Sequence, residues 1–455
     1  MKTKAPRLLI CAPASGGGKT TFTCGLLQAF ANRGLRLQAC KCGPDYIDPM
    51  FHREVIGADS RNLDLFFMSE NQVRELVAGG AREADMTVIE GVMGYYDGIA
   101  VSDEASAWDV ARATGTPAVL VVDGKGRARS IAAEVLGFLR FRNPSGIAGV
   151  VINRCAPMLY PRLKELIEQE CGIRAYGYVP VLQDCSLESR HLGLVTASEV
   201  ADLQVKLNKI ATTFEETIDI DGLLELAGTA PELSYEENAL NPPSLEHAPR
   251  IAVAHDDAFC FYYSDTLRTM EHLGAELVNF SPLSDAHLPE GASGLYLGGG
   301  YPELHCSELS GNTTLLAEIR EAAEAGMPII AECGGFMFLH EELEDAEGRF
   351  WPMVGVIPGR SFKTPRLSRF GYIDIEAKAD NLLCGVGDSL PAHEFHYWDS
   401  DAPGGAFRAQ KPQSPLGWEC AHATPTLYAG YPHLCLHACP SSLERFVRAC
   451  AQYHA

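Results

Sequence analysis

Residues 8–21 read LLICAPASGGGKTT, and this stretch decides the fold of the first half of the chain. An apolar run is followed by a glycine-rich turn, and then by a lysine and two threonines at the start of a helical pattern. This order nearly matches the phosphate-loop motif G-x-x-x-x-G-K-[ST], with Pro13 in place of the first glycine. In such loops backbone N–H groups wrap phosphate oxygens, the lysine reaches the terminal phosphates and the hydroxyl binds Mg²⁺. We therefore expect a nucleotide site formed by Gly16, Gly17, Gly18, Lys19, Thr20 and Thr21.

The sequence around this loop alternates short apolar runs with helical patterns. The expected strands are 8–12, 35–40, 86–90, 118–123, 147–153 and 175–179. The expected helices between them are 19–33, 70–79, 105–115, 129–141 and 160–170. Apolar strands separated by helices predict an α/β domain whose parallel sheet is covered on both faces. Ligands of such sheets bind at the carboxyl ends of the strands.

Two acidic residues follow expected strands of this sheet. Asp45 follows the strand 35–40, and Glu90 ends the strand 86–90. Mg²⁺ prefers oxygen ligands from carboxylates and water, in octahedral geometry. We therefore expect Thr20, Asp45 and Glu90 to ligate Mg²⁺, directly or through water.

A second α/β pattern occupies the C-terminal half. One more helix is expected near 203–221, after which periodicity is lost and four prolines occur up to residue 249. We therefore expect domains at 1–228 and 250–455, joined by a linker at 229–249. The later elements are expected strands at 251–254, 277–280, 294–297 and 328–331, expected helices at 263–273, 315–325 and 442–452, and antiparallel hairpins within 349–430.

The second half contains a candidate nucleophile. The strand at 328–331 leads into Glu332-Cys333-Gly334-Gly335 and an apolar helix, the pattern of a nucleophile elbow. The helix N-terminus is expected to lower the pKa of the Cys333 thiol. The amides of Gly299 and Gly300, which follow another strand, are candidates for an oxyanion hole. A thiol nucleophile needs a base, and the sequence leaves both His433 and His437 open for that role.

The segment around these histidines also admits a metal site. His433, Cys435, His437 and Cys439 recur at every second position, which on a strand would place all four side chains on one face. The segment lacks the usual C-x₂-C spacing, so the metal reading is disfavoured.

Composition excludes several classes of protein. The chain has 455 residues, of which 46% are hydrophobic and 21% charged, as in ordinary globular proteins. Apolar runs are too short to span a bilayer, so a membrane protein is not expected. The net charge of −22 disfavours nucleic-acid partners, because such a surface repels phosphate backbones. The 15 cysteines are scattered and odd in number, which favours free thiols and a reducing, cytoplasmic location.

Several motifs together resemble the cobyrinic acid a,c-diamide synthase family. The resemblance runs from residue 8 to about residue 440, with the motifs in the same order in both halves. The motifs are AP-x-SG-x-GKTT at 12–21, GPDYIDP at 43–49, EG-x-MG-x-YDG at 90–98, VD at 122–123, NR at 153–154, RHLGL at 190–194, DAF-x-FYY at 257–263, GGGYPE at 298–303 and HEFHY at 393–397.

The resemblance implies a glutamine- and ATP-dependent amidoligase of cobalamin synthesis. It implies an N-terminal, dethiobiotin-synthetase-like phosphate-loop domain and a C-terminal glutamine amidotransferase domain of the Cys-nucleophile type. By similarity, Cys333 attacks glutamine and releases ammonia, while ATP phosphorylates the a- and c-acetate carboxylates of cobyrinic acid. Ammonia then displaces phosphate from each acyl phosphate.

The resemblance also suggests roles for individual residues. Asp48 and Asp97 are expected to position ammonia or the substrate carboxylate, and Tyr46 and Ile47 to select the acetate. Asn153 is expected to read the adenine or to cap a turn. Arg190 and His191 are candidates for holding the polycarboxylate substrate.

The base of the glutaminase departs from the wider class of amidotransferases. Related enzymes often carry His-x-Glu, whereas here Cys435 stands two positions after His433. The family generally lacks that glutamate, so a Cys–His dyad is expected. Tyr431, which precedes it, favours His433 as the histidine of this dyad, with His437 still open.

Two alternatives remain open at this point. The same diamidation could act on sirohydrochlorin, nickel-sirohydrochlorin or sirohaem, because these rings carry the same two acetates. A ParA/MinD-like regulatory ATPase with a non-catalytic amidotransferase-like domain is the more distant alternative. The expected partners are small molecules only, and a homodimer is possible.

Overall fold

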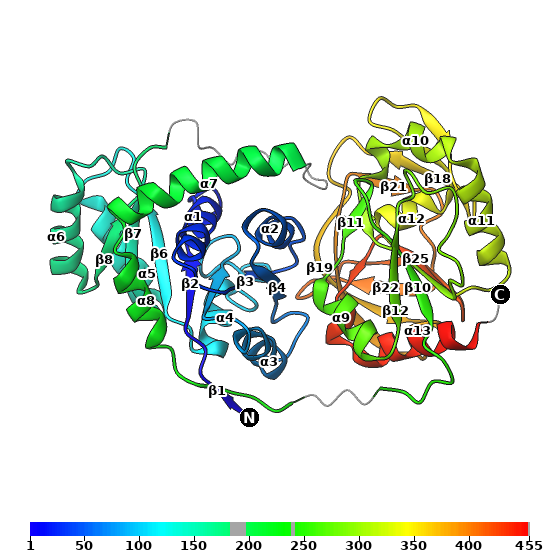
Figure 1. The fold of residues 1–455 in the computed structure, drawn as a ribbon, viewed down its shortest axis with the longest axis horizontal. Coiled ribbons are helices and arrows are strands. Elements are labelled where there is room, and N and C mark those ends of the chain that lie inside the picture. Colours follow the sequence, from blue (N-terminus) through cyan, green and yellow to red (C-terminus); the bar gives the residue numbers. More distant parts are fainter. Residues whose placement is uncertain (183–196, 238–241, 454–455) are drawn as a thin grey trace. The chain divides into compact units, whose positions relative to one another are not determined.

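The computed structural model describes residues 1–182, 197–237 and 242–453. These residues form two compact units, one on each side of the gap at 238–241 (Figure 1). Unit 1 contains the described residues before the gap, and unit 2 those after it. The bounds predicted for the two domains and their linker stay a prediction.

Unit 1 is built on a seven-stranded parallel sheet with the order β4-β3-β5-β2-β6-β7-β8. Its strands are β2 (Arg7–Cys11), β3 (Leu37–Cys42), β4 (Asp59–Leu63), β5 (Met86–Glu90), β6 (Ala118–Asp123), β7 (Ile147–Asn153) and β8 (Ala175–Tyr178). The six expected strands are confirmed. The edge strand β4 was not expected, because its sequence DSRNL is mostly polar and carries no apolar run.

Helices cover this sheet on both faces, as Figure 1 shows. They are α1 (Lys19–Asn32), α2 (Ile47–Phe51), α3 (Glu70–Ala81), α4 (Ala107–Thr114), α5 (Ser130–Phe141), α6 (Tyr160–Cys171), α7 (Ala197–Thr217) and α8 (Ile220–Gly228), with a π-helical turn η1 (His52–Ile56) after α2. Side-chain hydrogen bonds determine where several of these helices begin. Ser69, for example, begins α3 with a reciprocal capping box to Gln72.

The single helix expected at 203–221 is wrong, because α7 and α8 are separate. The chain breaks at Ile218–Asp219, where it meets the sheet edge. The Asp219 N–H donates to the Tyr176 carbonyl, and the Asp219 side chain accepts the Gly222 N–H and so begins α8. This contact with a distant strand cannot be read from helical periodicity.

The N-terminus pairs with a segment inside the expected linker. β1 (Lys2–Thr3) and β9 (Leu233–Ser234) form a two-stranded antiparallel ladder. Part of the stretch at 229–249 is therefore ordered against unit 1.

Unit 2 is built on a six-stranded sheet with the order β12-β10-β13-β15-β25-β24. All neighbours are parallel except β24, which runs antiparallel to β25. The strands are β10 (Arg250–Ala254), β12 (Glu276–Phe280), β13 (Gly294–Leu297), β15 (Ile329–Glu332), β24 (His422–Ala423) and β25 (Leu427–Gly430). The helices are α9 (Ser264–His272), α10 (Cys306–Gly311), α11 (Thr313–Glu324), α12 (Gly334–Phe338) and α13 (Pro440–Gln452), with 3₁₀ turns η2 (Pro302–Leu304) and η3 (Leu436–Ala438).

The antiparallel pairing expected within 349–430 is confirmed in part, in two further sheets that also include strands outside this range and one parallel pairing. One is β17-β16-β18-β21 and the other β23-β22-β19-β20-β26. Their strands are β16 (His340–Glu344), β17 (Phe350–Pro352), β18 (Ile357–Lys363), β19 (Arg369–Ala377), β20 (Ser389–His396), β21 (Trp398–Ser400), β22 (Phe407–Gln410), β23 (Gly417–Cys420) and β26 (His433–Leu434). A short pair, β11 (Phe259–Phe261) and β14 (Gly299–Gly300), lies apart from these sheets.

The core of unit 2 lies on both faces of its main sheet. Along β10, Ala252 and Ala254 join one apolar cluster, while Ile251 and Val253 join another. Alternate side chains of one strand point to opposite faces, so both faces are covered. This is the α/β architecture that the apolar runs predict.

Two expectations from composition concern the whole chain. Within the described residues every cysteine is a free thiol, and all but Cys171 and Cys439 are buried. None of the described helices is long and apolar enough to cross a membrane.

Candidate active sites

The phosphate loop lies between β2 and α1 of unit 1. Gly18 immediately precedes α1 with a φ of 89°, and Gly16 has a φ of 74°. A side chain at Gly18 would lie 2.1 Å from the Asn153 amide nitrogen. Glycine is required there because the backbone is left-handed and the space is filled.

The lysine of the loop is held in place by carbonyl groups. Lys19 Nζ donates to the Ala14 carbonyl at 3.1 Å and to the Met93 carbonyl. Met93 has a φ of 45°, a strained conformation for this residue, and belongs to the EG-x-MG motif after β5. Burial, and next the charge of Lys41, lower the pKa of Lys19. A bound phosphate would give this lysine an anionic partner in direct contact.

Glu90 and Asp45 lie at the same edge of the sheet, because β3, β5 and β2 are neighbours. The Thr20 hydroxyl donates to Glu90 Oε1 at 2.5 Å. Asp45 Oδ1 accepts the N–H groups of Ile47 and Asp48, and its other oxygen lies 4.0 Å from Lys41 Nζ. The structure thus brings the three expected magnesium ligands to one edge.

Sequence reasoning missed two basic residues beside Glu90. Lys41 Nζ lies 2.9 Å from Glu90 Oε1 and 2.5 Å from Asp48 Oδ2, and all three side chains are buried. His52 Nε2 lies 3.5 Å from Glu90 Oε2. The available signal was Lys41 as the single charged residue of the strand LQACKC, because a buried lysine requires an acidic partner.

These contacts set the charge of Glu90. Burial alone would raise its pKa, but the charge of Lys41, with contributions from His52 and the Thr20 hydroxyl, outweighs burial and holds the pKa below its usual value. Glu90 is therefore a carboxylate at neutral pH. A buried carboxylate bonded to the hydroxyl that follows the loop lysine is a donor set that fits Mg²⁺.

Four further residues expected in the substrate site lie near this edge. Asp48 is buried against Lys41. Asp97 accepts the Gly94 N–H through Oδ2, which shapes the loop after β5. Tyr46 is buried, whereas Ile47, at the start of α2, is partly exposed. Arg190 and His191 lie outside the described residues.

Asn153 ends β7 beside the phosphate loop. Its Nδ2 donates to the Gly17 carbonyl at 3.1 Å, and its Oδ1 accepts the Arg154 N–H. Both ends of the amide are thus engaged by backbone. Asn153 therefore stabilises the turn after β7 and the phosphate loop. Its role in reading the adenine stays a prediction.

Cys333 lies at the end of β15 in unit 2, where the strand turns into α12. It has a φ of 47° and a ψ of −99°, a conformation that non-glycine residues rarely adopt. The Cys333 N–H donates to the Gly430 carbonyl of the neighbouring strand at 2.8 Å. This is the strand–turn–helix geometry expected of a nucleophile elbow.

Gly299 and Gly300 lie between the elbow and His433. A side chain at Gly299 would lie 2.6 Å from His433 Cε1, and one at Gly334 would lie 3.0 Å from the Gly300 nitrogen. The structure therefore gathers Cys333, the two candidate oxyanion glycines and His433. Only a residue without a side chain fits at Gly299.

His437 lies in a different environment. Its Nδ1 lies 3.1 Å from the Thr266 hydroxyl, and its ring lies close to the Cys435 sulfur and the Tyr263 ring. These are contacts with η3 and α9 rather than with the elbow. The geometry therefore favours His433 over His437 as the base.

The structure does not support a metal site formed by His433, Cys435, His437 and Cys439. β26 ends at Leu434 and η3 follows, so the four alternating residues do not share a strand face. Among the described residues, no group of three histidine, cysteine or acidic side chains is placed to hold a metal ion.

The expectation of a lowered thiol pKa is wrong. Burial, and next the charge of Glu303, raise the pKa of Cys333. The five-residue helix α12 does not offset this loss of solvation. Burial, and next His393 and His396, lower the pKa of His433. The resting site thus holds a neutral thiol and a neutral imidazole.

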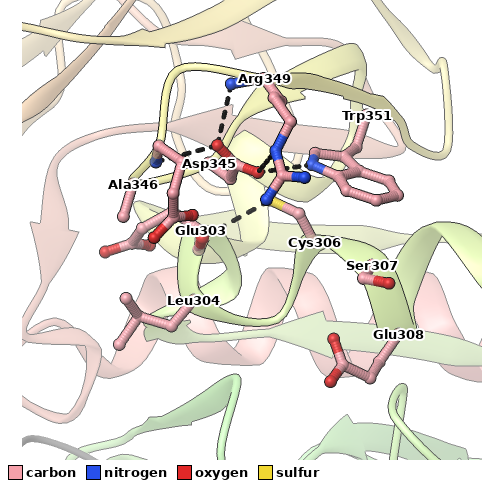
Figure 2. A pocket seen from close by; sticks show the side chains of 10 residues that line it. Glu303, Leu304, Cys306, Ser307, Glu308, Asp345, Ala346, Arg349 and Trp351 are labelled. Carbon is pink, nitrogen blue, oxygen red and sulfur yellow. Dashed lines mark hydrogen bonds and ion pairs between the residues drawn. The ribbon is translucent and has the colours of Figure 1, made fainter.

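Glu303 also lines a surface hollow of unit 2, together with residues of the β16–β17 hairpin (Figure 2). Its centre is Asp345, whose Oδ1 accepts the Glu347 and Arg349 N–H groups and whose Oδ2 accepts the Trp351 indole N–H. These bonds tie the β16–β17 hairpin together. Asp345, the acidic residue at which these bonds meet, therefore serves the hairpin.

Comparisons with known proteins agree with this geometry. Residues 8–195 match the CobQ/CobB/MinD/ParA nucleotide binding domain, and residues 250–439 match the CobB/CobQ-like glutamine amidotransferase domain. The chain is therefore an enzyme, an amidoligase that contains a glutamine amidotransferase domain.

Relatives over almost the whole length give the particular family. Proteins named cobyrinate a,c-diamide synthase are 38% identical in Caldanaerobacter subterraneus subsp. tengcongensis, over 98% of both chains, and 38% identical in Salmonella typhimurium, over 99% of both. A third, from Listeria innocua, is 41% identical over 86% of both chains. The chain belongs to the cobyrinate a,c-diamide synthase family.

Solved structures resemble parts of the chain only distantly. The structure of PurLQS from Thermotoga maritima is 16% identical, covering 44% of this chain and 96% of that one, with a TM-score of 0.31. The MinD cell division protein of Aquifex aeolicus is 15% identical, covering 49% of this chain and 94% of that one, with a TM-score of 0.30. These matches carry no argument about function.

Proposed function

We propose that this protein amidates the a- and c-acetate carboxylates of cobyrinic acid in cobalamin synthesis, using ATP and glutamine. The observation that carries the proposal is the similarity of both units, over 98% of the chain, to a cobyrinate a,c-diamide synthase. The geometry of the two candidate sites supports the same chemistry.

Unit 1 would activate the carboxylate. A carboxylate does not react with ammonia at neutral pH, because oxide is a poor leaving group. Transfer of the terminal phosphoryl group of ATP to the carboxylate gives an acyl phosphate. Ammonia then attacks the acyl carbon and phosphate leaves. Lys19 and the amides at 16–20 would bind the phosphates and stabilise charge on the transferring group.

Magnesium fits the edge formed by Thr20, Asp45 and Glu90. These residues offer one hydroxyl and two carboxylates beside the phosphate loop, and bound Mg²⁺ supplies neutralisation of phosphate charge. Lys41 would hold Glu90 ionised and oriented while the hydroxyl of Thr20 stays within reach.

The remaining residues at this edge would bind the substrate. Asp48 and Asp97 are proposed to position ammonia or the carboxylate, and Tyr46 and Ile47 to select the acetate. Arg190 and His191 are proposed to hold further carboxylates of the ring, and Asn153 to contact the nucleotide.

Unit 2 would supply the ammonia. The Cys333 sulfur attacks the side-chain amide of glutamine as its proton passes to His433. The N–H groups of Gly299 and Gly300 would stabilise the tetrahedral oxyanion. The proton on His433 then goes to the leaving nitrogen, ammonia departs, and water hydrolyses the γ-glutamyl thioester to glutamate and free thiol.

A mass-spectrometric amidation assay tests the proposal. Cobyrinic acid, sirohydrochlorin, nickel-sirohydrochlorin and sirohaem would be offered separately with ATP, Mg²⁺ and glutamine. We expect two successive carboxylate-to-amide mass shifts, with cobyrinic acid preferred. Preference for another ring would contradict the substrate but keep the chemistry, and no product from any ring would contradict both. A homodimer also stays a proposal, to be tested by light scattering.

A further inference from the structure

A buried histidine that acts as a base usually has its second ring nitrogen held by a carboxylate. The carboxylate selects the tautomer and stabilises the imidazolium that forms during the reaction. The residue two positions after His433, where enzymes of the wider class often carry glutamate, is Cys435. The sequence therefore predicts a dyad in which nothing acidic supports His433.

The structure places a carboxylate beside His433 from another part of the chain. Glu332 Oε2 lies 3.9 Å from His433 Nδ1. Both side chains are almost wholly buried, with 1% and 4% of their surface exposed. The separation is longer than a hydrogen bond, and catalytic contacts of this kind are often longer before substrate binds.

The rest of the Glu332 carboxylate is held by two neighbours. The Tyr296 hydroxyl, on β13, lies 3.5 Å from Oε1, and the backbone N–H of Leu434 bonds to the carboxylate. Leu434 directly follows His433 in β26. The carboxylate thus joins the end of β15 to the strand that carries the histidine.

The strand register explains how one element supplies two functional residues. Glu332 pairs with Gly430 of β25, and the Cys333 N–H bonds to the Gly430 carbonyl. The turn at Cys333, with its positive φ, takes the thiol out of the strand direction. Glu332 and Cys333 are therefore consecutive, yet one is within the sheet and the other at its rim.

We infer that Glu332 is the positioning residue for His433, completing a Cys333–His433–Glu332 triad whose acid precedes the nucleophile in the chain. Its carboxylate would accept the Nδ1 proton and leave Nε2 to receive the thiol proton. The inference rests on the proposed glutaminase function of unit 2. No new covalent step is added, because Glu332 only stabilises the imidazolium.

The surrounding groups make such support necessary. The His393 ring stacks on His433 with centroids 4.9 Å apart, and with His396 on the same strand it disfavours a positive charge on His433. Besides burial, the charges of Glu303, Glu394 and Glu332 itself raise the pKa of the Cys333 thiol.

The charge of Glu332 then gives a pH signature. Burial raises its pKa to about 8, while the Leu434 N–H and the Tyr296 hydroxyl act in the opposite direction. The carboxylate form becomes dominant only above this pH. The kcat/KM for glutamine hydrolysis, which reports ionisations of the free enzyme, should therefore rise as pH increases through about 8.

The test compares Glu332→Gln, Glu332→Asp and Tyr296→Phe in the full-length protein. Glutamine hydrolysis and ammonia-dependent amidation would be measured from pH 6 to 10, about two units either side of the pKa. We expect Glu332→Gln to lower kcat for glutamine about 10- to 100-fold, less than the about 10²- to 10⁴-fold cost of losing the base itself. The KM for glutamine and the ammonia-dependent rate should change little, and the rise near pH 8 should disappear.

The two other variants separate positioning from simple packing. Glu332→Asp keeps the charge, so it should recover part of the lost kcat and retain a pH-dependent rise. Tyr296→Phe removes one neighbour but keeps the carboxylate, so its kcat should stay close to wild type, and its pH midpoint should move upward.

Three results would overturn the inference. They are a wild-type kcat for Glu332→Gln, equal losses for the Gln and Asp variants, or an unchanged pH profile in Glu332→Gln. Should Glu332→Gln fail to fold, seen as loss of ammonia-dependent amidation, the Asp and Phe variants decide by the same criteria. Failure of the proposed function is distinct, because the wild-type protein would then show no glutaminase activity at all.

Discussion

Glu90 and Glu332 occupy equivalent places in two different sheets. Each ends a central parallel strand, β5 in unit 1 and β15 in unit 2, and each is wholly buried. Their pKa values nevertheless move in opposite directions. The difference is Lys41, which lies 2.9 Å from Glu90, whereas Glu332 faces tyrosines, the Cys333 thiol, a backbone N–H and a histidine whose own pKa is lowered.

The comparison shows how position and charge are set independently. Strand ends place a carboxylate at the rim of a sheet, but its neighbours decide whether it is ionised. In unit 1, Glu90 is ionised before any ligand binds, which suits the binding of a metal ion and phosphates. In unit 2 the Cys333 thiol and the His433 imidazole are neutral at rest, so their charges arise only as glutamine reacts. Four predictions, in order of decreasing effect, test this contrast.

Cys333→Ala should abolish glutamine-dependent amidation while preserving amidation with free ammonia. The sulfur is the only group in the proposed mechanism that forms a bond to glutamine, so no substitute remains. Product formation with each nitrogen donor would be measured by mass spectrometry. Loss of both activities would mean that Cys333 has a structural role and that the two centres are not chemically separate.

His433→Asn should lower glutamine hydrolysis about 10²- to 10⁴-fold, because the thiol is neutral and depends on a base. The matched variant His437→Asn should hydrolyse glutamine at a rate close to wild type, since His437 contacts Thr266 rather than the elbow. A larger loss in the His437 variant would reverse the assignment of the base.

Glu90→Gln should lower ATP-dependent amidation at least about 100-fold, because a metal ligand typically contributes several kcal/mol to stabilising the transferring phosphoryl group. Glutaminase activity should persist, since it belongs to unit 2. Amidation should recover in part at high Mg²⁺ if the defect is metal binding. Wild-type amidation would remove Glu90 from the metal site.

Lys41→Met should destabilise unit 1 by about 3–5 kcal/mol, because it leaves buried carboxylates without their cation. Urea unfolding would measure the loss. The double variant Lys41→Met, Glu90→Gln should be less unstable than the sum of the single changes, since less charge is stranded. Arg36→Met, which breaks the exposed Arg36–Asp85 pair, is the control and should change stability little. Simple additivity would contradict the coupling.

Much of the fold was predictable because its signals are local. The apolar runs predicted six of the seven strands of the unit 1 sheet, and glycine-rich turns after strands predicted both loops that carry the candidate sites. The failures share one cause. β4 is polar and gains its place only by pairing with β3, and the break between α7 and α8 depends on contact with Tyr176. Neither leaves a pattern in its own segment.

The candidate sites divide in the same way. Cys333 and Lys19 were identifiable because a nucleophile elbow and a phosphate loop are contiguous. For the base, Tyr431 favoured His433 over His437 already in the sequence, but the two histidines lie four residues apart in one segment, and packing against Gly299 is what separates them. The contacts of Lys41 and His52 with Glu90 were not predicted, because Glu90 is distant from both in the chain.

The sequence by itself determined the class of fold, the phosphate loop, the elbow and, through the order of its motifs, the family. These are properties of short segments, in which backbone conformation depends on residues a few positions apart. The tertiary structure alone decided the ionisation of Glu90 and Glu332 and the meeting of Glu332 with His433. Such features depend on burial and on charges within a few ångströms, and these distances exist only after distant strands have paired.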